Sequence, residues 1–331
     1  MTASTAWNHP FADAIQQRRA DAAAGTWQRI LYTIRNGCAT VTINRPKVLN
    51  CFDYLTLLEL ADAFHDAARD PQVFVVVLTG AGERAFCTGA DLTEQRDVLA
   101  PNPQHYHTWM GAFIDVHERL RNIGKPTVAR VNGIAVGGGN EFNMACDLAI
   151  AADHAYIRHV GPYHGSVPAG GATQWLPLFV GDRRAREIIW LGEEIAASTA
   201  CEWGLYNAVV PMDELDDAVQ RYVDKLLTAL PETLRYTRTQ TNFFKDLAWY
   251  QTIHHARDWL TVHTAAPEVH AAVEAFTNKQ PLDHTTIHRH HGTANGAYRW
   301  GAPGQSCNAC GASGLPSAFT HCGACGVHLD T

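Results

Sequence analysis

The residues best suited to chemistry lie between Pro126 and Gln174. Three consecutive glycines, Gly137 to Gly139, follow a short apolar segment and stand just before Glu141, where a helix pattern begins. Glycine lets the backbone turn tightly and approach a ligand, and the first N–H groups of a helix have no acceptor within that helix. Such donors stabilise a developing negative charge, and a neighbouring carboxylate can move a proton.

A second loop in the same stretch, residues 161–168, carries an imidazole and a hydroxyl group. His164 can transfer a proton, or it can simply satisfy buried backbone groups. Ser166 can bind a substrate oxygen, or it can cap the helix that we expect to open at Gly170 and Gly171. The stretch therefore offers one carboxylate, one imidazole, one hydroxyl and two glycine-opened helix starts.

Four cysteines near the end of the sequence form a separate pattern. Two Cys-x-x-Cys-Gly motifs contain Cys307, Cys310, Cys322 and Cys325. Four thiolates can surround Zn²⁺ as a tetrahedron, and so short a segment cannot build a hydrophobic core of its own. We expect a zinc ribbon whose closed coordination shell makes the metal structural; two redox-active cysteine pairs are the alternative. Such a ribbon can contact another protein or a neighbouring subunit, or cover the substrate.

The composition is typical of a globular protein without a polyanionic partner. With 331 residues, 46% of them hydrophobic, the chain can hold one large domain or two. The formal net charge of −7 argues against general binding to nucleic acid. Residues 1–26 lack the apolar core of a signal peptide, and no apolar run is long enough to span a membrane. We therefore expect a cytoplasmic protein, not associated with membranes, whose five other cysteines are free thiols.

The order of apolar patterns predicts the fold class. A hairpin turn at Asn36-Gly37 joins two apolar segments, a helix pattern covers 54–69, and an uninterrupted apolar run at 73–78 indicates a central strand. Strands and helices alternate in the first half of the chain, whereas residues 182–277 are mostly helical, interrupted by a short strand at 208–210. This order predicts an α/β core followed by an α-helical C-terminal region.

Three segments are less informative. The first 26 residues have the composition of a polar, alanine-rich helical extension, and residues 278–303, rich in Pro, Gly, Thr and His, have that of a solvated linker. Residues 101–123 predict a loop and a helix. We expect three histidines of this segment on its polar surface, because no carboxylate or cysteine repeats with them at a ligand spacing: His105, His107 and His117.

Three motifs together resemble the crotonase (enoyl-CoA hydratase/isomerase) superfamily: Phe86 to Leu92, Val136 to Glu141, and Pro168 to Gln174. The resemblance implies a ββα spiral core that binds an acyl-CoA thioester, with coenzyme A as part of the substrate, and assembly as a homotrimer or hexamer. The expected divisions of the chain are an N-terminal extension (1–27), the crotonase-like domain (28–281), a linker (282–303) and the zinc ribbon (304–331).

The resemblance also implies roles for individual residues. The backbone N–H groups of Ala90 and Gly138 match those that polarise the thioester carbonyl in this family, and Gly89 and Gly137 precede them. Glu141 matches the first of the two glutamates that hydratases place around a water molecule. The second would fall near Gly161, where this sequence has no carboxylate. Hydration by the usual glutamate pair is therefore not expected.

The loop 161–168 resembles that of 6-oxocyclohex-1-ene-1-carbonyl-CoA hydrolase and, less closely, that of 2-ketocyclohexanecarboxyl-CoA hydrolase. It keeps the Gly-Pro and His-Gly-Ser elements, but Tyr163 replaces a lysine, and Pro168 stands where the second enzyme has an aspartate. This likeness implies water addition and ring opening with Glu141 as general base, His164 assisting proton transfer, and Tyr163 and Ser166 binding the substrate. The alternatives are a single-glutamate enoyl-CoA hydratase or isomerase, and a non-catalytic scaffold whose ribbon recruits partners.

Overall fold

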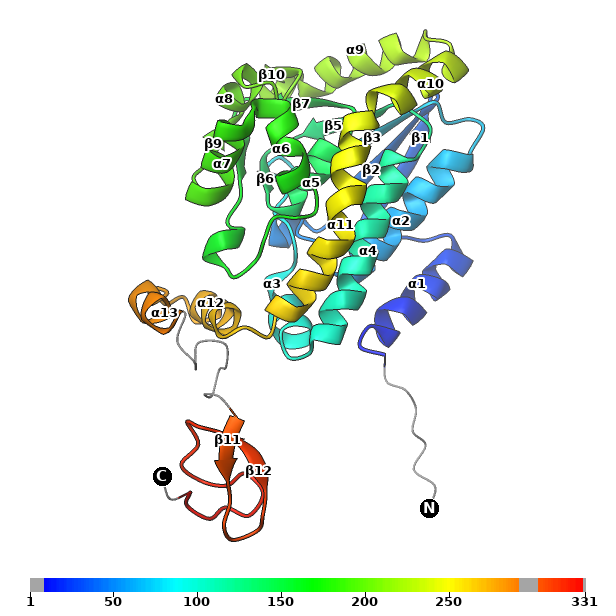
Figure 1. Ribbon diagram of the computed structural model, residues 1–331. Helices are drawn as coiled ribbons and strands as arrows, with labels where there is room; N and C mark the ends of the chain where they lie inside the picture. Colours follow the sequence, from blue (N-terminus) through cyan, green and yellow to red (C-terminus); the bar gives the residue numbers. More distant parts are fainter. Residues whose placement is uncertain (1–8, 292–302, 330–331) are drawn as a thin grey trace.

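The computed structural model describes residues 9–291 and 303–329 (Figure 1). Outside these ranges fall the first residues of the expected N-terminal extension, residues 292–302 of the expected linker, and the last two residues of the chain. The described part forms the expected α/β core with two sheets, whose strand orders are β1-β2-β3-β5-β7-β10 and β4-β6-β8-β9. The cysteine-containing segment forms a further two-stranded sheet, β11 (Pro303–Ser306) and β12 (Ser313–Pro316).

The larger sheet begins with the predicted hairpin. Asn36 and Gly37 both have positive φ, 49° and 81°, as the tight turn that matches the twist of a hairpin requires. After this antiparallel pair every further neighbour is parallel. The strands are β1 (Ile30–Arg35), β2 (Cys38–Ile43), β3 (Val75–Gly80), β5 (Thr127–Val131), β7 (Leu148–Ala152) and β10 (Ala208–Val210).

The smaller sheet arises because the chain repeats a ββα unit. After β3, β5 and β7 in the larger sheet, the next strand in each case joins the smaller sheet, and helices follow it. Its strands are β4 (Ala85–Cys87), β6 (Ile134–Val136), β8 (Tyr156–Arg158) and β9 (Ile195–Ala196). The three successive units form the expected crotonase-like spiral, and the segments that follow β4, β6 and β8 meet at one edge.

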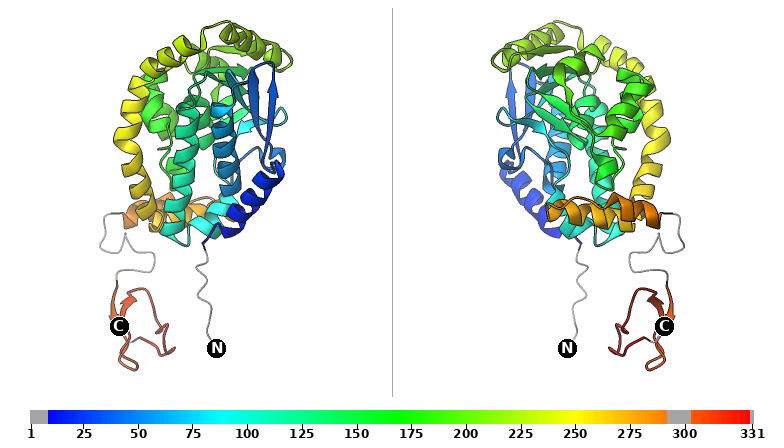
Figure 2. Two further views of the ribbon diagram at one scale, coloured as in Figure 1. Left: turned by 90° about the vertical axis from the view of Figure 1, so that its right-hand side faces the viewer. Right: turned by 90° about the vertical axis from the view of Figure 1, so that its left-hand side faces the viewer.

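Helices cover both faces of the larger sheet. Alternate residues of β3 point to opposite faces: Val76 and Leu78 belong to the main core, whereas Val75 and Val77 pack with α9 (Leu215–Leu227). On the main-core side α2 (Tyr54–Arg69), α4 (Pro103–Arg121) and α11 (Phe243–His263) run side by side (Figures 1 and 2). The central strand is therefore buried on both faces, as its continuous apolar sequence predicts.

The predicted helical C-terminal region is confirmed. The helix expected at 182–191 is α7 (Asp182–Leu191), and the short strand expected at 208–210 is β10. The other helices from this half of the chain are α6 (Ala172–Val180), α8 (Ala197–Glu202), α10 (Pro231–Thr241) and α12 (Pro267–Thr277). Among the described residues, no helix is long and apolar enough to cross a membrane.

Helices also lie at both flanks of the core. Helix α1 (Ala12–Ala24) packs against α2, because Phe11 stacks on Tyr54 and Arg18 pairs with Asp62 at 2.7 Å. Helix α13 (His284–His290) lies within the segment 278–303, whose composition indicated a solvated linker. Asp283 begins this helix, since its carboxylate accepts hydrogen bonds from the backbone N–H and the hydroxyl of Thr286.

Candidate active site

A cavity of about 720 Å³ opens where the segments after β4, β6 and β8 meet. Helices α4, α11 and α12 and the segment 48–52 before α2 also contribute to its wall. Of the eight residues that the sequence nominated for catalysis or substrate binding, all except Tyr163 lie on this wall: Gly89, Ala90, Gly137, Gly138, Glu141, His164 and Ser166. Residues far apart in the sequence are therefore brought together by the three turns of the spiral.

The loop after β4 leaves the amide of Ala90 unpaired. Ala90 forms an isolated parallel bridge with Phe52, in which Phe52 N–H donates to the Gly89 carbonyl and Asp91 N–H donates to the Phe52 carbonyl, both at 2.9 Å. In a parallel bridge the N–H of the central residue points away from its partner strand. No described residue accepts a hydrogen bond from Ala90 N–H, and Ala90 lies on the cavity wall.

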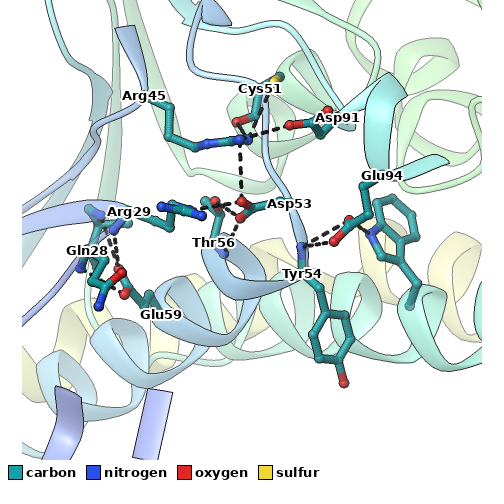
Figure 3. Close-up of polar contacts among 12 residues, drawn as sticks. Gln28, Arg29, Arg45, Cys51, Asp53, Tyr54, Thr56, Glu59, Asp91 and Glu94 are labelled. Atoms are coloured by element: carbon teal, nitrogen blue, oxygen red, sulfur yellow. Dashed lines mark hydrogen bonds and ion pairs between the residues drawn. The ribbon is translucent and has the colours of Figure 1, made fainter. Parts of the chain in front are cut away.

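A network of ion pairs fixes the position of the loop that follows β4 (Figure 3). Arg45 binds the carboxylate of Asp91 at 2.8 Å and the carbonyl of Cys51 at 2.7 Å. Arg45 also lies 3.4 Å from Asp53, which caps α2 and pairs with Arg29 at 2.9 Å. Although burial alone would raise the pKa of the Asp91 carboxyl group, the hydrogen bond from Arg45 lowers it below its usual range. Asp91, the residue that follows Ala90, therefore carries a negative charge.

Glu94 ties the next segment to the cavity wall (Figure 3). Its carboxylate oxygens accept hydrogen bonds from the backbone N–H of Tyr54 and from Nε1 of Trp109, both at 3.0 Å. Burial raises the pKa of Glu94 to about 7. Trp109 belongs to α4 and lines the cavity, so Glu94 joins the short helix α3 (Leu92–Glu94) to the N-terminus of α2 and to that wall.

The loop after β6 supplies the second free amide. Helix α5 (Gly138–Ala145) makes its first hydrogen bond from Glu141 N–H to the Gly137 carbonyl, so the preceding N–H groups have no acceptor within the helix. A Cβ atom on Gly89 would lie only 3.4 Å from the nitrogen of Gly138, which shows how closely the two loops approach. A Cβ atom on Gly138 would lie 2.6 Å from the ring of Phe52. Glycine is therefore required there by the packing.

Glu141 is a buried carboxyl group on the cavity wall. Only 3% of the residue is exposed, and its Oε1 accepts a hydrogen bond from Ala172 N–H at 3.1 Å. Burial raises the pKa of Glu141 to about 7, although the backbone N–H groups of Ala172 and Gly170 lower it in part. A carboxyl group with this pKa exchanges protons readily near neutral pH. A Cβ atom on Gly170 would lie 2.7 Å from Glu141 Oε2, so the second glycine-rich loop must remain small beside it.

The loop after β8 carries three nominated side chains, those of Tyr163, His164 and Ser166, and each has different surroundings. His164 meets Phe276 of α12 edge to face at 5.2 Å, and burial lowers the pKa of its imidazole. The side chain of Ser166 does not cap α6, because the N-cap residue of that helix is Gly171. Tyr163 is 42% exposed, donates its hydroxyl hydrogen to the Trp190 carbonyl at 2.9 Å, and lines an adjoining groove of about 580 Å³ rather than the cavity. The structure thus separates Tyr163 from the other nominated residues.

One face of α4 forms a wall that sequence reasoning did not identify. Tyr106, Trp109, Met110 and Phe113 all line the cavity, with the 3- and 4-residue spacing of one helix face. Burial raises the pKa of the Tyr106 phenol to about 12. The helical spacing of these residues was a signal for an inward face, but it does not distinguish a packed core from a cavity wall.

The cysteine cluster is compatible with a metal site. The four Sγ atoms of Cys307, Cys310, Cys322 and Cys325 lie within 4.8 Å of one another, and two of the Sγ–Sγ distances are 3.6 and 3.7 Å. A tetrahedron with Zn–S bonds of about 2.3 Å has sulfur–sulfur edges of roughly 3.8 Å. Four thiolates at this spacing therefore match the donor set and size of a Zn²⁺ site.

The spiral fold and the cavity define the class of protein. Two glycine-opened loops with free backbone amides stand beside a buried carboxyl group on successive ββα units, which is the arrangement of a crotonase-type acyl-CoA enzyme. The chain belongs to the enoyl-CoA hydratase/isomerase family, which it matches over residues 33–286.

Solved structures with the same fold carry this family name. An enoyl-CoA hydratase from Mycobacterium avium subsp. paratuberculosis K-10 is 28% identical with a TM-score of 0.70, over 77% of this chain and 98% of that one. An enoyl-CoA hydratase/isomerase from Xanthobacter autotrophicus Py2 is 29% identical with a TM-score of 0.71, over 76% and 94%. An enoyl-CoA hydratase from Bacillus anthracis is 30% identical with a TM-score of 0.63, over 76% and 97%. The family core thus accounts for about three quarters of the chain.

Proposed function

We propose that this enzyme opens the ring of an alicyclic oxo- or enone-CoA thioester by adding water and cleaving a C–C bond. The observation that carries the proposal is the isolation of Glu141. Among the described residues that line the cavity there is no second aspartate or glutamate, and Gly161 occupies the position where hydratases of this family would place one. A pair of carboxylates around one water is therefore absent, whereas the amides of Ala90 and Gly138 are present.

The proposed reaction uses Glu141 as general base. Glu141 takes a proton from water while the water oxygen attacks the carbon of the ring ketone. The bond between that carbon and the α-carbon of the thioester then breaks, and its electron pair moves into the thioester enolate. The N–H groups of Ala90 and Gly138 stabilise the enolate oxygen, and each such donor typically contributes about 2.7–4 kcal/mol. The proton held by Glu141 passes to the α-carbon, so the product is a ring-opened carboxylic acid.

The other nominated residues have supporting roles in this proposal. Gly89 and Gly137 let the backbone approach the thioester, and Ser166 binds the ring carbonyl. His164, which its lowered pKa keeps neutral near pH 7, assists proton transfer. Tyr163 contacts the substrate only outside the acyl cavity, because its ring lines the adjoining groove. With an enone substrate, Glu141 first adds water to the conjugated double bond.

A second candidate function is hydration or isomerisation of an enoyl-CoA with Glu141 alone. The names of the similar structures favour it, since two of them are called enoyl-CoA hydratases and one an enoyl-CoA hydratase/isomerase. A non-catalytic scaffold is the third candidate. The buried, proton-exchanging Glu141 beside two free amides argues against a scaffold, because a binding surface has no need of that arrangement.

The proposal includes a structural Zn²⁺ and an oligomer. Cys307, Cys310, Cys322 and Cys325 would hold the metal and fold the C-terminal ribbon, which can then contact a partner or a neighbouring subunit. Assembly as a homotrimer or hexamer is supported by large hydrophobic side chains that are exposed on or next to α10 and α11 of the single chain. They include Leu230, Tyr236, Phe243, Phe244, Leu247 and Tyr250.

Two thioesters separate the candidate functions. The purified protein is incubated with 2-ketocyclohexanecarboxyl-CoA and, separately, with a linear enoyl-CoA, and the products are analysed by mass spectrometry. The cyclic ketone has no C=C bond, so a stable gain of one water reports ring opening, whereas the same gain on the linear thioester reports hydration. We expect turnover of the cyclic ketone and its loss in Glu141→Gln. Turnover of the linear thioester alone would establish the hydratase alternative.

A further inference from the structure

Three aromatic side chains form one continuous part of the cavity wall. Phe52 lies just before α2, and Trp109 and Phe113 lie one turn apart on α4; all three line the cavity. Their ring centroids are 5.3–5.8 Å apart, and their ring planes differ by only 15–21°. These three rings, called the aromatic wall below, therefore pack against one another and present an apolar surface to the cavity.

The aromatic wall lies directly beside the groups that act on the substrate. A Cβ atom on Gly138 would lie 2.6 Å from the Phe52 ring and 3.3 Å from the Phe113 ring. A Cβ atom on Gly170 would collide with the Phe113 ring and lie 2.7 Å from Glu141 Oε2. An acyl group that is held by the Gly138 N–H and faces Glu141 must then lie against this wall. The inference rests on the proposed function for that placement of the thioester.

Trp109 is the member of the aromatic wall whose orientation a hydrogen bond fixes. Its Nε1–H donates to Glu94 Oε2 at 3.0 Å. The same carboxylate accepts a hydrogen bond from the Tyr54 N–H, which lies 3.0 Å from each of its oxygens (Figure 3). A phenyl ring looks the same after a half-turn, but a reversed indole would leave its N–H without this acceptor. An unpaired buried donor is costly, so Glu94 favours one orientation of the indole.

Glu94 acts on the cavity through Trp109. Its sequence neighbours Thr93 and Gln95 line the cavity, whereas Glu94 is not among the described residues that do so. Its carboxylate connects three elements: α3, which follows the loop of Ala90, the first residue of α2, and the middle of the cavity-lining face of α4. Glu94 is therefore placed to hold the aromatic wall in position without touching the substrate.

We propose that Glu94 is a positioning residue that fixes Trp109 in the aromatic wall, and that this wall selects acyl-CoA thioesters whose acyl group is an apolar ring. A rigid ring can lie against the three aromatic rings without first being ordered. A linear chain with the same number of carbon atoms loses rotational freedom when it binds there. Without the Glu94 carboxylate the indole N–H has to find another acceptor, and the wall loses its fixed shape.

The test compares two thioesters with the same number of acyl carbon atoms, cyclohexanecarboxyl-CoA and heptanoyl-CoA. Neither contains a C=C bond or a ring ketone, so neither hydration nor ring opening consumes it, and calorimetry gives both dissociation constants. Glu94→Met removes the acceptor of Trp109. Glu118→Met is the matched control: Glu118 accepts a hydrogen bond from Nε1 of buried Trp249 at 3.5 Å, and neither of these two residues lines the cavity.

We expect the wild type to bind the cyclic thioester about 2- to 12-fold more tightly than the linear one. Glu94→Met should lose most of this preference while its affinity for free coenzyme A is unchanged, and Glu118→Met should keep the preference. In a Trp109→Phe background, Glu94→Met should cause no further loss, because its effect passes through the indole N–H. Glu94→Gln keeps one acceptor oxygen and should show a smaller loss, so it replaces Glu94→Met if that variant does not fold.

These measurements separate the inference from the proposed function. If 2-ketocyclohexanecarboxyl-CoA is not opened but the preference for the ring depends on Glu94, ring opening is refuted and the role of Glu94 stands. The inference is overturned if the wild type does not prefer the cyclic thioester, or if Glu94→Met keeps the preference. It is also overturned if Glu94→Met causes the same loss with and without the Trp109 indole. Circular dichroism of each variant establishes that it is folded.

Discussion

Replacing Glu141 by glutamine should make the protein less active and, above neutral pH, more stable. The carboxyl group is buried, and its pKa is raised from 4.5 to about 7. Each pKa unit corresponds to 1.36 kcal/mol, so ionising Glu141 in the folded protein costs roughly 3 kcal/mol more than in the unfolded chain. Glutamine has nearly the same shape, and its amide oxygen can still accept the hydrogen bond that Ala172 N–H donates to Glu141.

The sign of the pH dependence follows from the direction of the shift. Because the folded state holds the proton of Glu141 more tightly than the unfolded state, the wild type has its full stability below pH 4.5 and loses part of it as the pH rises through 7. Glu141→Gln has no proton to lose at this site. Its free energy of unfolding, relative to the wild type, should therefore increase between pH 5 and pH 8 by roughly 3 kcal/mol.

Urea unfolding followed by tryptophan fluorescence at pH 5, 6, 7 and 8 measures this difference. Glu187→Gln is the matched control, since Glu187 is exposed on α7. In parallel, wild-type kcat/KM should rise with pH around a midpoint near 7, and Glu141→Gln should lose about 10²- to 10⁴-fold in kcat. A stability difference that does not change with pH would refute the buried-acid reasoning, and full activity of the variant would refute Glu141 as the base.

Three further predictions concern other parts of the chain. Gly139→Ala should reduce stability by about 1–3 kcal/mol or more in urea unfolding, because its Cβ would lie 1.9 Å from the backbone carbonyl of Cys87; unchanged stability would contradict the packing. Arg45→Met should cost about 3–5 kcal/mol by leaving Asp91 unpaired, and Arg45→Met with Asp91→Asn should recover part of that loss; equal stabilities of the single and double variants would count against the pairing. Elemental analysis should find one Zn²⁺ per chain, and Cys322→Ser should abolish it while the urea midpoint of the core is retained; metal-free wild-type protein with reactive thiols would favour the redox alternative.

Much of the fold could be predicted because its determinants are local. The continuous apolar run at 73–78 needs only its own residues to indicate a strand covered on both faces, and β3 (Val75–Gly80) is buried throughout. The Asn36-Gly37 pair likewise predicts a two-residue hairpin turn from its own residue types. Such a turn requires positive φ angles, and both residues have them. The spacing of the four cysteines also predicts that their sulfur atoms can converge, as they do within 4.8 Å.

The sequence-based predictions were wrong where contacts between residues far apart in the sequence determine the structure. We expected His117 on a polar surface, but it is completely buried on the inward face of α4. There its Nδ1–H donates a hydrogen bond to the Phe113 carbonyl at 2.9 Å, and its ring stacks on Trp249. Burial lowers the pKa of His117 to about 3, so the ring is neutral and packs as an aromatic group. Its hydrophilic residue type therefore gave the wrong face of the helix.

Some residues of the candidate site could likewise be predicted from local motifs, and others could not. Ala90, Gly138 and Glu141 stand in glycine-containing motifs whose geometry is local, and the structure brings them to one cavity. Tyr106 belongs to no motif, and its place on the cavity wall depends on how α4 packs against segments that lie far along the chain. Tyr163 belongs to a motif but turns outward to the Trp190 carbonyl, a contact that no residue spacing predicts.

The lack of a second carboxylate among the described residues of the cavity wall has a physical consequence for Glu141. Two carboxyl groups in one desolvated cavity raise each other's pKa, and their protons leave in two coupled steps. Here Glu141 is the one carboxyl group among the described residues that line the cavity. The acid limb of the pH–rate profile should then follow a single proton with a midpoint near 7, set mainly by burial of Glu141. A carboxylate introduced at the empty position, as in Gly161→Glu, should move that midpoint upward, because a second negative charge makes Glu141 harder to ionise.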